Sequence, residues 1–261
     1  MPYREKYVHQ IWFQGEKFIP EKYIQNINNT KKILNGWKYI FWDNQKIKKF
    51  LMERNLRYLN KYNEYKLMHQ KIDIAKYMIL YYYGGIYIDM DAYAVKDPSY
   101  LFEEYPFFEV FVSSLEVFNY EKIMYLQFNE IVNNGIILSI PKSSLMLDLI
   151  ENCPHKFISL SNTVQINYTT GPAIFSKFVA KNNKTKILPK EYFEPLSHTK
   201  RNITDKTIII HEHSISWMED KIKFMFQKYL KYRNNIRIII YTSFLLSITI
   251  SFNYFNIIIQ I

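Results

Sequence analysis

Two aspartates separated by one residue, Asp89 and Asp91, come directly after the apolar segment 86–88. On an extended strand, side chains two residues apart point to the same face, so both carboxylates can converge on one hard divalent cation. Such a cation would bridge a diphosphate and offset the charge that grows on it as a leaving group. The pair therefore predicts a Mn²⁺ or Mg²⁺ site, with a solvated loop as the alternative for an isolated D-x-D triplet.

A second pair of polar residues, Asp73 and Lys76, lies shortly before these aspartates. The segment 66–83 has apolar residues on one face and predicts a helix, which the Gly84-Gly85 pair ends because glycine tolerates the left-handed conformation of a C-cap. A strand over 86–91 follows at once. Asp73 and Lys76 are therefore expected to face the same cleft as the acidic pair.

A third polar group follows the apolar segment 208–210, where His211 and His213 mark the end of another predicted strand. Proteins with α/β sheets bind their ligands at such strand ends. Cys153 is the only cysteine, which excludes an intramolecular disulfide and a zinc site built from cysteines. Oxygen and imidazole ligands are therefore expected, and which of the two histidines reaches the metal is left open.

The elements that must position these residues alternate between strands and helices, which predicts an α/β sheet. Strands are predicted at 7–13, 37–42, 86–91, 107–112, 135–140 and 207–211, helices at 20–35, 44–60 and 66–83, and loops at 182–186 and 198–204.

The bulk composition predicts one catalytic domain. The chain has 261 residues, of which 48% are hydrophobic and 18% aromatic, enough for one sizeable core. Its formal charge of +10 comes from lysines spread along the whole sequence, so no nucleic-acid partner is expected. No apolar run of signal-peptide length precedes the first predicted strand, so no secretory peptide is expected.

The C-terminal region has a different composition. Residues 238–259 include no charged side chain, over a length that would span a bilayer, and Arg233 and Arg237 precede them. We expect a catalytic domain over 1–222, a basic amphipathic linker over 223–237 and a membrane helix over 238–259. The positive-inside rule then places the catalytic domain in the cytoplasm. A final core helix in a soluble cytoplasmic protein is the alternative.

The run from Asp73 to Asp91 resembles the signature of the DXD sugar-transferase family, glycosyltransferase family 32, which includes yeast-type initiating mannosyltransferases. It is also similar to the core of the clostridial glucosylating toxins. The segments 8–12, 39–43 and 211–217 resemble three further elements of that family, in the same order. The resemblance implies a GT-A type fold, which is a Rossmann-like mixed sheet with flanking helices. It also implies an enzyme that transfers a hexose with retention of the anomeric configuration.

The resemblance also implies roles for individual residues. Asp89 and Asp91 would hold Mn²⁺ or Mg²⁺ with His211 or His213 beside them, and Asp73 and Lys76 would contact the donor sugar and phosphates, Lys76 standing where the family usually has arginine. The implied donor-binding residues are Ile11, Trp12, Asp73, Lys76, Tyr87, Ser216 and Trp217, with Trp12 stacked on the base.

The expected partners are a nucleotide-sugar donor, a glycan, lipid-linked or protein acceptor, and a membrane. Two other classes stay open. A haloacid-dehalogenase-like phosphohydrolase also presents an Asp-x-Asp pair at a strand end, although Tyr93 stands where that class needs Thr or Val. A membrane-bound scaffold with a degenerate transferase domain is the other. It would have lost one of the acidic residues Asp73, Asp89 or Asp91, and all three are present.

Overall fold

The computed structural model describes residues 6–115, 117, 121, 130–158, 161–196, 202–214 and 218–259, without the side chains of 241 and 244–259. Its strands are β1 (Tyr7–Ile11), β2 (Lys38–Trp42), β3 (Gly85–Ile88), β4 (Ala92–Ala94), β5 (Val110–Ser113), β6 (Ile136–Ser139), β7 (Thr185–Leu188) and β8 (Ile209–His211). Its helices are η1 (Glu16–Phe18), α1 (Glu21–Ile33), α2 (Asn44–Arg54), α3 (Leu56–Glu64), α4 (Met68–Tyr83), α5 (Tyr100–Glu104), α7 (Ser144–Asn152), α8 (Asn162–Thr169), α9 (Pro172–Val179) and α10 (Asp220–Ile259).

Within these residues the main sheet has the strand order β2-β1-β3-β6-β5-β7. Strands β2, β1 and β3 run parallel, β6 runs antiparallel to both of its neighbours, and β7 is parallel to β5. Strands β4 and β8 form a separate antiparallel pair. The predicted α/β class is therefore confirmed, as a mixed sheet that is mostly parallel.

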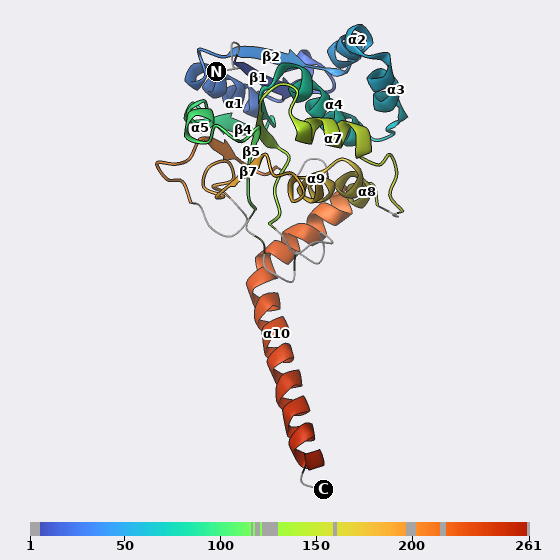
Figure 1. Ribbon diagram of the computed structural model, residues 1–261, viewed down its shortest axis with the longest axis vertical. Helices are drawn as coiled ribbons and strands as arrows, with labels where there is room; N and C mark the ends of the chain where they lie inside the picture. Colours follow the sequence, from blue (N-terminus) through green and yellow to red (C-terminus); the bar gives the residue numbers. More distant parts are fainter. Residues whose placement is uncertain are drawn as a thin grey trace.

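Helices and the small sheet cover the two faces of the main sheet (Figure 1). Side chains alternate between the faces, as the period of a strand requires. Tyr87 of β3 belongs to a core shared with α2, α3, α4, α7 and α9, whereas Ile86 and Ile88 belong to a core shared with β4 and β8. Strand β3 is thus buried on both sides, and only its C-terminal end is open for a site.

The Gly84-Gly85 pair makes the turn from α4 into β3. Both glycines have positive φ, 64° and 92°. A Cβ on Gly85 would lie 2.3 Å from the carbonyl oxygen of Tyr7 in the adjacent β1. Only glycine fits this position, and the tight turn fixes how far β3 extends toward the site.

Some predicted elements differ from the observed ones. The helix predicted over 44–60 is two helices, α2 and α3, because Asn55 takes an extended conformation and its side chain caps the second helix. The segment 182–186, predicted as a loop, runs into β7, which pairs with β5 at the edge of the sheet. Of the loop predicted at 198–204, residues 198–201 lie outside the described residues.

Helix α10 extends from the body to the C-terminus (Figure 1). In its first half, the buried Arg233 forms an ion pair of 2.5 Å with Glu121, which also accepts a hydrogen bond from Tyr229. The segments 223–237 and 238–259 are parts of this one helix.

The membrane helix predicted over 238–259 has no support in the described part of the chain. There, no helix is both long enough and apolar enough to cross a bilayer. The first half of α10 carries many lysines and arginines, and most of the side chains of the predicted span lie outside the described residues.

Candidate active site

Three strand ends meet at one edge of the main sheet and create the site. The parallel strands β1 and β3 finish there, and because β6 is antiparallel to β3, β6 begins there. The backbone N–H of Asp89 donates to the carbonyl of Gly135 over 2.8 Å, which extends the β3–β6 pairing by one residue. The residues after β3 and those before β6 are therefore held side by side.

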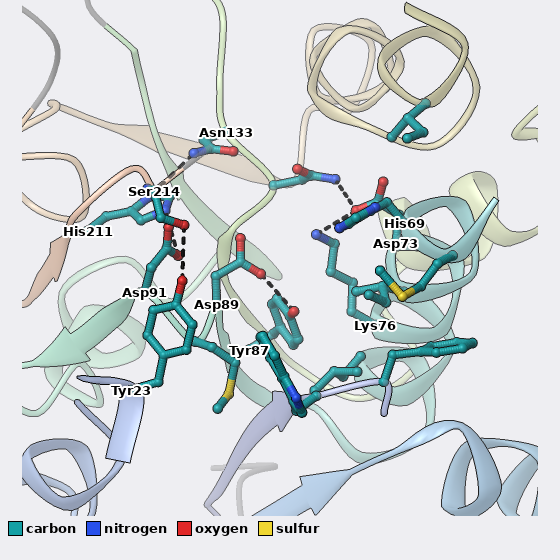
Figure 2. Close-up of a pocket in the computed structure, with 18 of the residues that line it drawn as sticks. Tyr23, His69, Asp73, Lys76, Tyr87, Asp89, Asp91, Asn133, His211 and Ser214 are labelled. Carbon is teal, nitrogen blue, oxygen red and sulfur yellow. Dashed lines mark hydrogen bonds and ion pairs between the residues drawn. The ribbon is translucent and has the colours of Figure 1, made fainter. Parts of the chain in front are cut away.

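A pocket of about 280 Å³ opens at this edge (Figure 2). Nine of the residues predicted for the site line it: Ile11, Trp12, Asp73, Lys76, Tyr87, Asp89, Asp91, His211 and His213. The other two, Ser216 and Trp217, lie outside the described residues. Residues from β1, α4, β3 and the end of β8 thus face one cavity.

The acidic side of the pocket consists of Asp89, Asp91 and His211. The β4–β8 pairing places Ala92 opposite His211, which brings the histidine beside residues 120 positions earlier in the chain. His211 Nε2 lies 3.3 Å from Asp91 Oδ1, and the backbone N–H of Ser214 donates to Asp91 Oδ2 over 2.7 Å. Asp89 Oδ1 accepts a hydrogen bond of 2.7 Å from the Tyr87 hydroxyl.

The two aspartates of the acidic side have opposite pKa shifts. Burial raises the pKa of Asp89 to about 6. The positive charge of Lys76 opposes this rise, and the Asp91 carboxylate adds to it. Burial would also raise the pKa of Asp91, but hydrogen bonds from His211 and Ser214 outweigh it and hold that pKa below its usual range. At neutral pH both carboxylates are therefore ionised, and the ionised form of Asp89 is disfavoured mainly by its burial.

Behind His211 lies a buried carboxylate, Glu194, which is only 1% exposed. Its Oε2 atom lies 3.0 Å from His211 Nδ1 and 2.8 Å from His213 Nε2. The two imidazole rings stack with centroids 4.1 Å apart. Burial opposes ionisation of Glu194, but the two histidines outweigh it and lower its pKa to about 2, while Glu194 and Asp91 raise the pKa of His211 well above its ordinary value.

The acidic side fits a divalent cation by the chemistry of its donors. One ligand atom each from Asp89, Asp91 and His211 lie within 4.8 Å of one another. Carboxylate oxygens with one imidazole nitrogen suit Mn²⁺ and, with oxygen ligands predominating, Mg²⁺. His213 belongs to a second such group, with Glu194 and His211.

The α4 side of the pocket consists of Asp73, Lys76, Asn134 and Thr170. Lys76, 2% exposed, forms an ion pair of 2.8 Å with Asp73 Oδ1. The Asn134 amide donates to the same oxygen over 3.0 Å, and the Thr170 hydroxyl donates to Asp73 Oδ2 over 3.0 Å. The charge of this buried aspartate is thus neutralised within the protein.

Aromatic side chains form a further wall of the pocket. Trp12 follows β1, and its ring lies 5.7 Å from that of Tyr23 on α1. The indole Nε1 of Trp12 is buried and has no hydrogen-bond partner among the described residues. A flat ligand against this wall would find an aromatic face.

Several residues of the site were not identified from the sequence. Glu194, Asn133 and Tyr23 interact with predicted site residues, and His69 lines the pocket one helical turn before Asp73. His69 carried a usable signal, because positions 69, 73 and 76 share one helical face. Glu194 carried none, because it reaches the site only through the fold of residues 189–196.

The comparisons with known proteins agree with this geometry. Residues 20–108 match the model of a family described as glycosyltransferase sugar-binding region containing the DXD motif. An uncharacterised glycosyltransferase of Acanthamoeba polyphaga mimivirus is 30% identical over 201 residues, 72% of each chain. The mannosyl phosphorylinositol ceramide synthase SUR1 of Saccharomyces cerevisiae is 25% identical over 232 residues, which are 84% of this chain and 53% of the yeast protein.

Among solved structures, mouse xyloside xylosyltransferase 1 matches with a TM-score of 0.49 at 12% identity, over 81% of this chain and 99% of that one. The glycosyltransferase PaToxG matches with a TM-score of 0.43 at 18% identity, over 68% and 69% of the two chains. The family match and the curated relatives give no support to a phosphohydrolase or to a degenerate scaffold.

Proposed function

Because the chain belongs to the glycosyltransferase family whose sugar-binding region contains the DXD motif, we propose that it transfers a hexose from a nucleoside-diphosphate sugar in a metal-dependent reaction. One observation carries the proposal: Asp89, Asp91 and His211 converge at one end of a pocket whose other side holds the buried Asp73–Lys76 pair. A cation-binding group and a sugar-binding group thus face the same cavity.

On the acidic side, Asp89, Asp91 and His211 would hold Mn²⁺ or Mg²⁺. The bound cation supplies positive charge against the leaving diphosphate. Lys76 would add a second positive charge, because its ammonium group has three donors and the ion pair with Asp73 uses one. Tyr87 holds Asp89 in place through its hydroxyl and packs its ring under the Lys76 ammonium, 5.0 Å away.

On the α4 side, Asp73 would bind a hydroxyl group of the donor sugar. A carboxylate has about four acceptor sites, and Lys76, Asn134 and Thr170 use three of those on Asp73. The remaining site, on Oδ2, suits a sugar hydroxyl, because Asp73 lines the pocket. Trp12 would stack on the base.

We propose that the reaction retains the anomeric configuration. Apart from Asp89 and Asp91, assigned to the cation, and Asp73, which is held by three neighbours, the pocket is lined by no carboxylate within the described residues. A front-side reaction, in which the departing phosphate takes the proton of the acceptor hydroxyl, needs no further carboxylate. Proton NMR of the first product would show inversion if this part of the proposal were wrong.

The finer assignments follow from the same proposal. The mixed sheet with its acidic pair at the end of β3 fits a GT-A type fold, and the name of the yeast relative makes a mannosyl donor the first to test. The acceptor is a glycan, a lipid-linked molecule or a protein, and association with a membrane through the C-terminal region remains part of the proposal.

The test is release of nucleoside diphosphate from a panel containing GDP-mannose, UDP-glucose and UDP-galactose, with Mn²⁺ or with a chelator. We expect release from one donor that requires the metal. Equal release in chelator would refute the metal role. Absence of release from every nucleotide sugar, by protein that binds Mn²⁺ and is folded, would refute the transferase proposal.

A further inference from the structure

The most unusual polar group outside the predicted set is the buried carboxylate of Glu194. One oxygen of this side chain, Oε2, lies within hydrogen-bond distance of two imidazoles, 3.0 Å from His211 Nδ1 and 2.8 Å from His213 Nε2. Removing a carboxylate from water is expensive unless its hydrogen bonds are made. His211 Nδ1 therefore points its N–H at Glu194, and His213 Nε2 forms an ion pair with the same carboxylate, which restrains both rings.

This orientation has a consequence for the cation site. With Nδ1 directed at Glu194, the other nitrogen of His211, Nε2, faces Asp91 at 3.3 Å and belongs to the acidic side. His213 instead uses its Nε2 atom on Glu194. The two histidines are therefore not equivalent. His211 presents its Nε2 atom to the carboxylates of the pocket, whereas His213 contacts Glu194, which lies behind His211.

We infer that Glu194, braced by His213, is a positioning residue that fixes His211 as the imidazole ligand of the divalent cation. The inference rests on the metal site of the proposed function and deepens it. Histidines that bind metals usually donate their second ring N–H to a carboxylate, which sets the ring orientation. Here that carboxylate comes from a distant segment of the chain, at residue 194.

The backbone of His213 gives independent support. Its φ of 53° lies in the left-handed region, which costs free energy for a residue with a side chain. This conformation places the His213 ring on that of His211, with centroids 4.1 Å apart, and the next residue, Ser214, donates its N–H to Asp91. The strained turn at residue 213 therefore holds His213 beside Glu194 and Ser214 beside Asp91.

A second cation between Glu194, His211 and His213 is the alternative, since one atom of each also lies within 4.8 Å of the others. The hydrogen bond of 3.0 Å between His211 Nδ1 and Glu194 Oε2 argues against it, because a nitrogen that carries this proton cannot also bind a cation. Metal stoichiometry separates the two arrangements, with one Mn²⁺ per chain expected and two contradicting the inference.

The experiment is a Mn²⁺ titration followed by electron paramagnetic resonance, which counts free Mn²⁺ without any turnover. Glu194→Gln keeps the shape of the side chain but removes its negative charge, and its amide NH₂ replaces Oε1, which lies 3.2 Å from His211 Nδ1. We expect its Mn²⁺ affinity to fall by about 10- to 100-fold, as for other partners of metal-binding histidines. His213→Asn, which suits a positive φ, should lower the affinity less, because the Glu194–His211 contact remains.

Glu109→Gln is the matched control, since Glu109 pairs with Lys184 and caps α7 away from the pocket. Its Mn²⁺ affinity should equal that of the wild type. If Glu194→Gln and His213→Asn, both folded by circular dichroism, also bind Mn²⁺ like the wild type, the positioning role is wrong. If the wild type itself binds no Mn²⁺, the metal site of the proposed function fails instead.

Should Glu194→Gln fail to fold, His213→Asn carries the test. A fall in its affinity supports the inference, and an unchanged affinity overturns it.

Discussion

Both sides of the pocket contain carboxylates, buried at Asp73 and half-buried at Asp89 and Asp91, and the two sides balance the negative charge differently. On the α4 side, Asp73 is neutralised by Lys76 and receives hydrogen bonds from Asn134 and Thr170. On the acidic side, Asp89 and Asp91 lie close enough to share one cation, and the pKa of Asp89 is raised to about 6. The protein alone thus balances the negative charge of the α4 side, whereas a bound cation would balance the negative charge of the acidic side more fully.

This difference predicts that variants on the two sides of the pocket will affect the stability of the fold and the activity to different extents. A residue of the α4 side supports the fold whether or not the donor is bound, so its loss should weaken both the fold and the reaction. On the acidic side, Asp89 opposes folding in the absence of metal because its pKa is raised, whereas Asp91, whose pKa is lowered, favours the folded state. Variants on the two sides should therefore change unfolding and activity in different proportions.

The largest effect is expected for Asp91→Asn. It removes one carboxylate of the cation site, and transfer should fall to background with Mn²⁺ binding lost, as measured by product formation and electron paramagnetic resonance. Asp148→Asn, an exposed aspartate on α7, is the control and should retain full activity. Normal turnover by folded Asp91→Asn would remove the metal role from this residue.

The next effect is expected for Lys76→Met, which leaves Asp73 buried with no positive partner. Breaking a buried ion pair in this way costs about 3–5 kcal/mol, measured by denaturant unfolding. The double variant Asp73→Asn/Lys76→Met should recover most of that stability and none of the activity. Lys71→Met, on the same helix but half-exposed, should change stability by less than about 0.5 kcal/mol. A similar loss in both single variants would contradict the role assigned to the pair.

A smaller effect of opposite sign is expected for Asp89→Asn in the presence of chelator. The pKa of Asp89 is higher in the folded protein than its ordinary 3.8, so the folded state binds more protons between pH 4 and 6. The wild type should therefore lose stability as pH rises through this window, by about 1–3 kcal/mol.

Asp89→Asn removes that loss and should be the more stable protein at pH 7 in chelator. Unfolding curves at pH 4, 5, 6 and 7 measure the difference. Parallel curves for the two proteins would refute the raised pKa.

The smallest effect is expected for Gly135→Ala. A Cβ at this position would lie 2.6 Å from Asp89 Oδ2 and 3.0 Å from His211 Cε1, so both side chains must move. Mn²⁺ affinity should fall about tenfold, the lower range for disturbing the surroundings of a metal ligand. Gly36→Ala is the control, because nothing lies within 4 Å of its added Cβ. Unchanged Mn²⁺ affinity in Gly135→Ala would show that the acidic side tolerates displacement.

The α4 side of the site was largely predictable from the sequence, since Asp73 and Lys76 share a helical face and the glycine turn leads directly into β3. The aspartate pair was predictable for the same reason. These features depend on helix and strand periods, which operate over a few residues. Strand β7 was missed because its four residues, Thr185–Leu188, are too few to show a clear alternation.

The rest of the acidic side depends on contacts between distant segments. Glu194 lies 17 residues before His211, with no local pattern to connect them. The sequence left open which histidine faces the metal, because both follow the same strand. The orientation depends on the position of Glu194 and on the positive φ of His213, which are properties of the tertiary structure.

The pairing of β4 with β8 also has a consequence for the order of events during synthesis of the chain. Asp89 and Asp91 are made early, just past the first third of the sequence, but Ala92 meets His211 only after the strand near residue 210 has been added. Contacts of such long separation form late in folding. A nascent chain therefore exposes its acidic pair long before the cation site is complete. It can bind the metal with all three ligands only after β8 has been added.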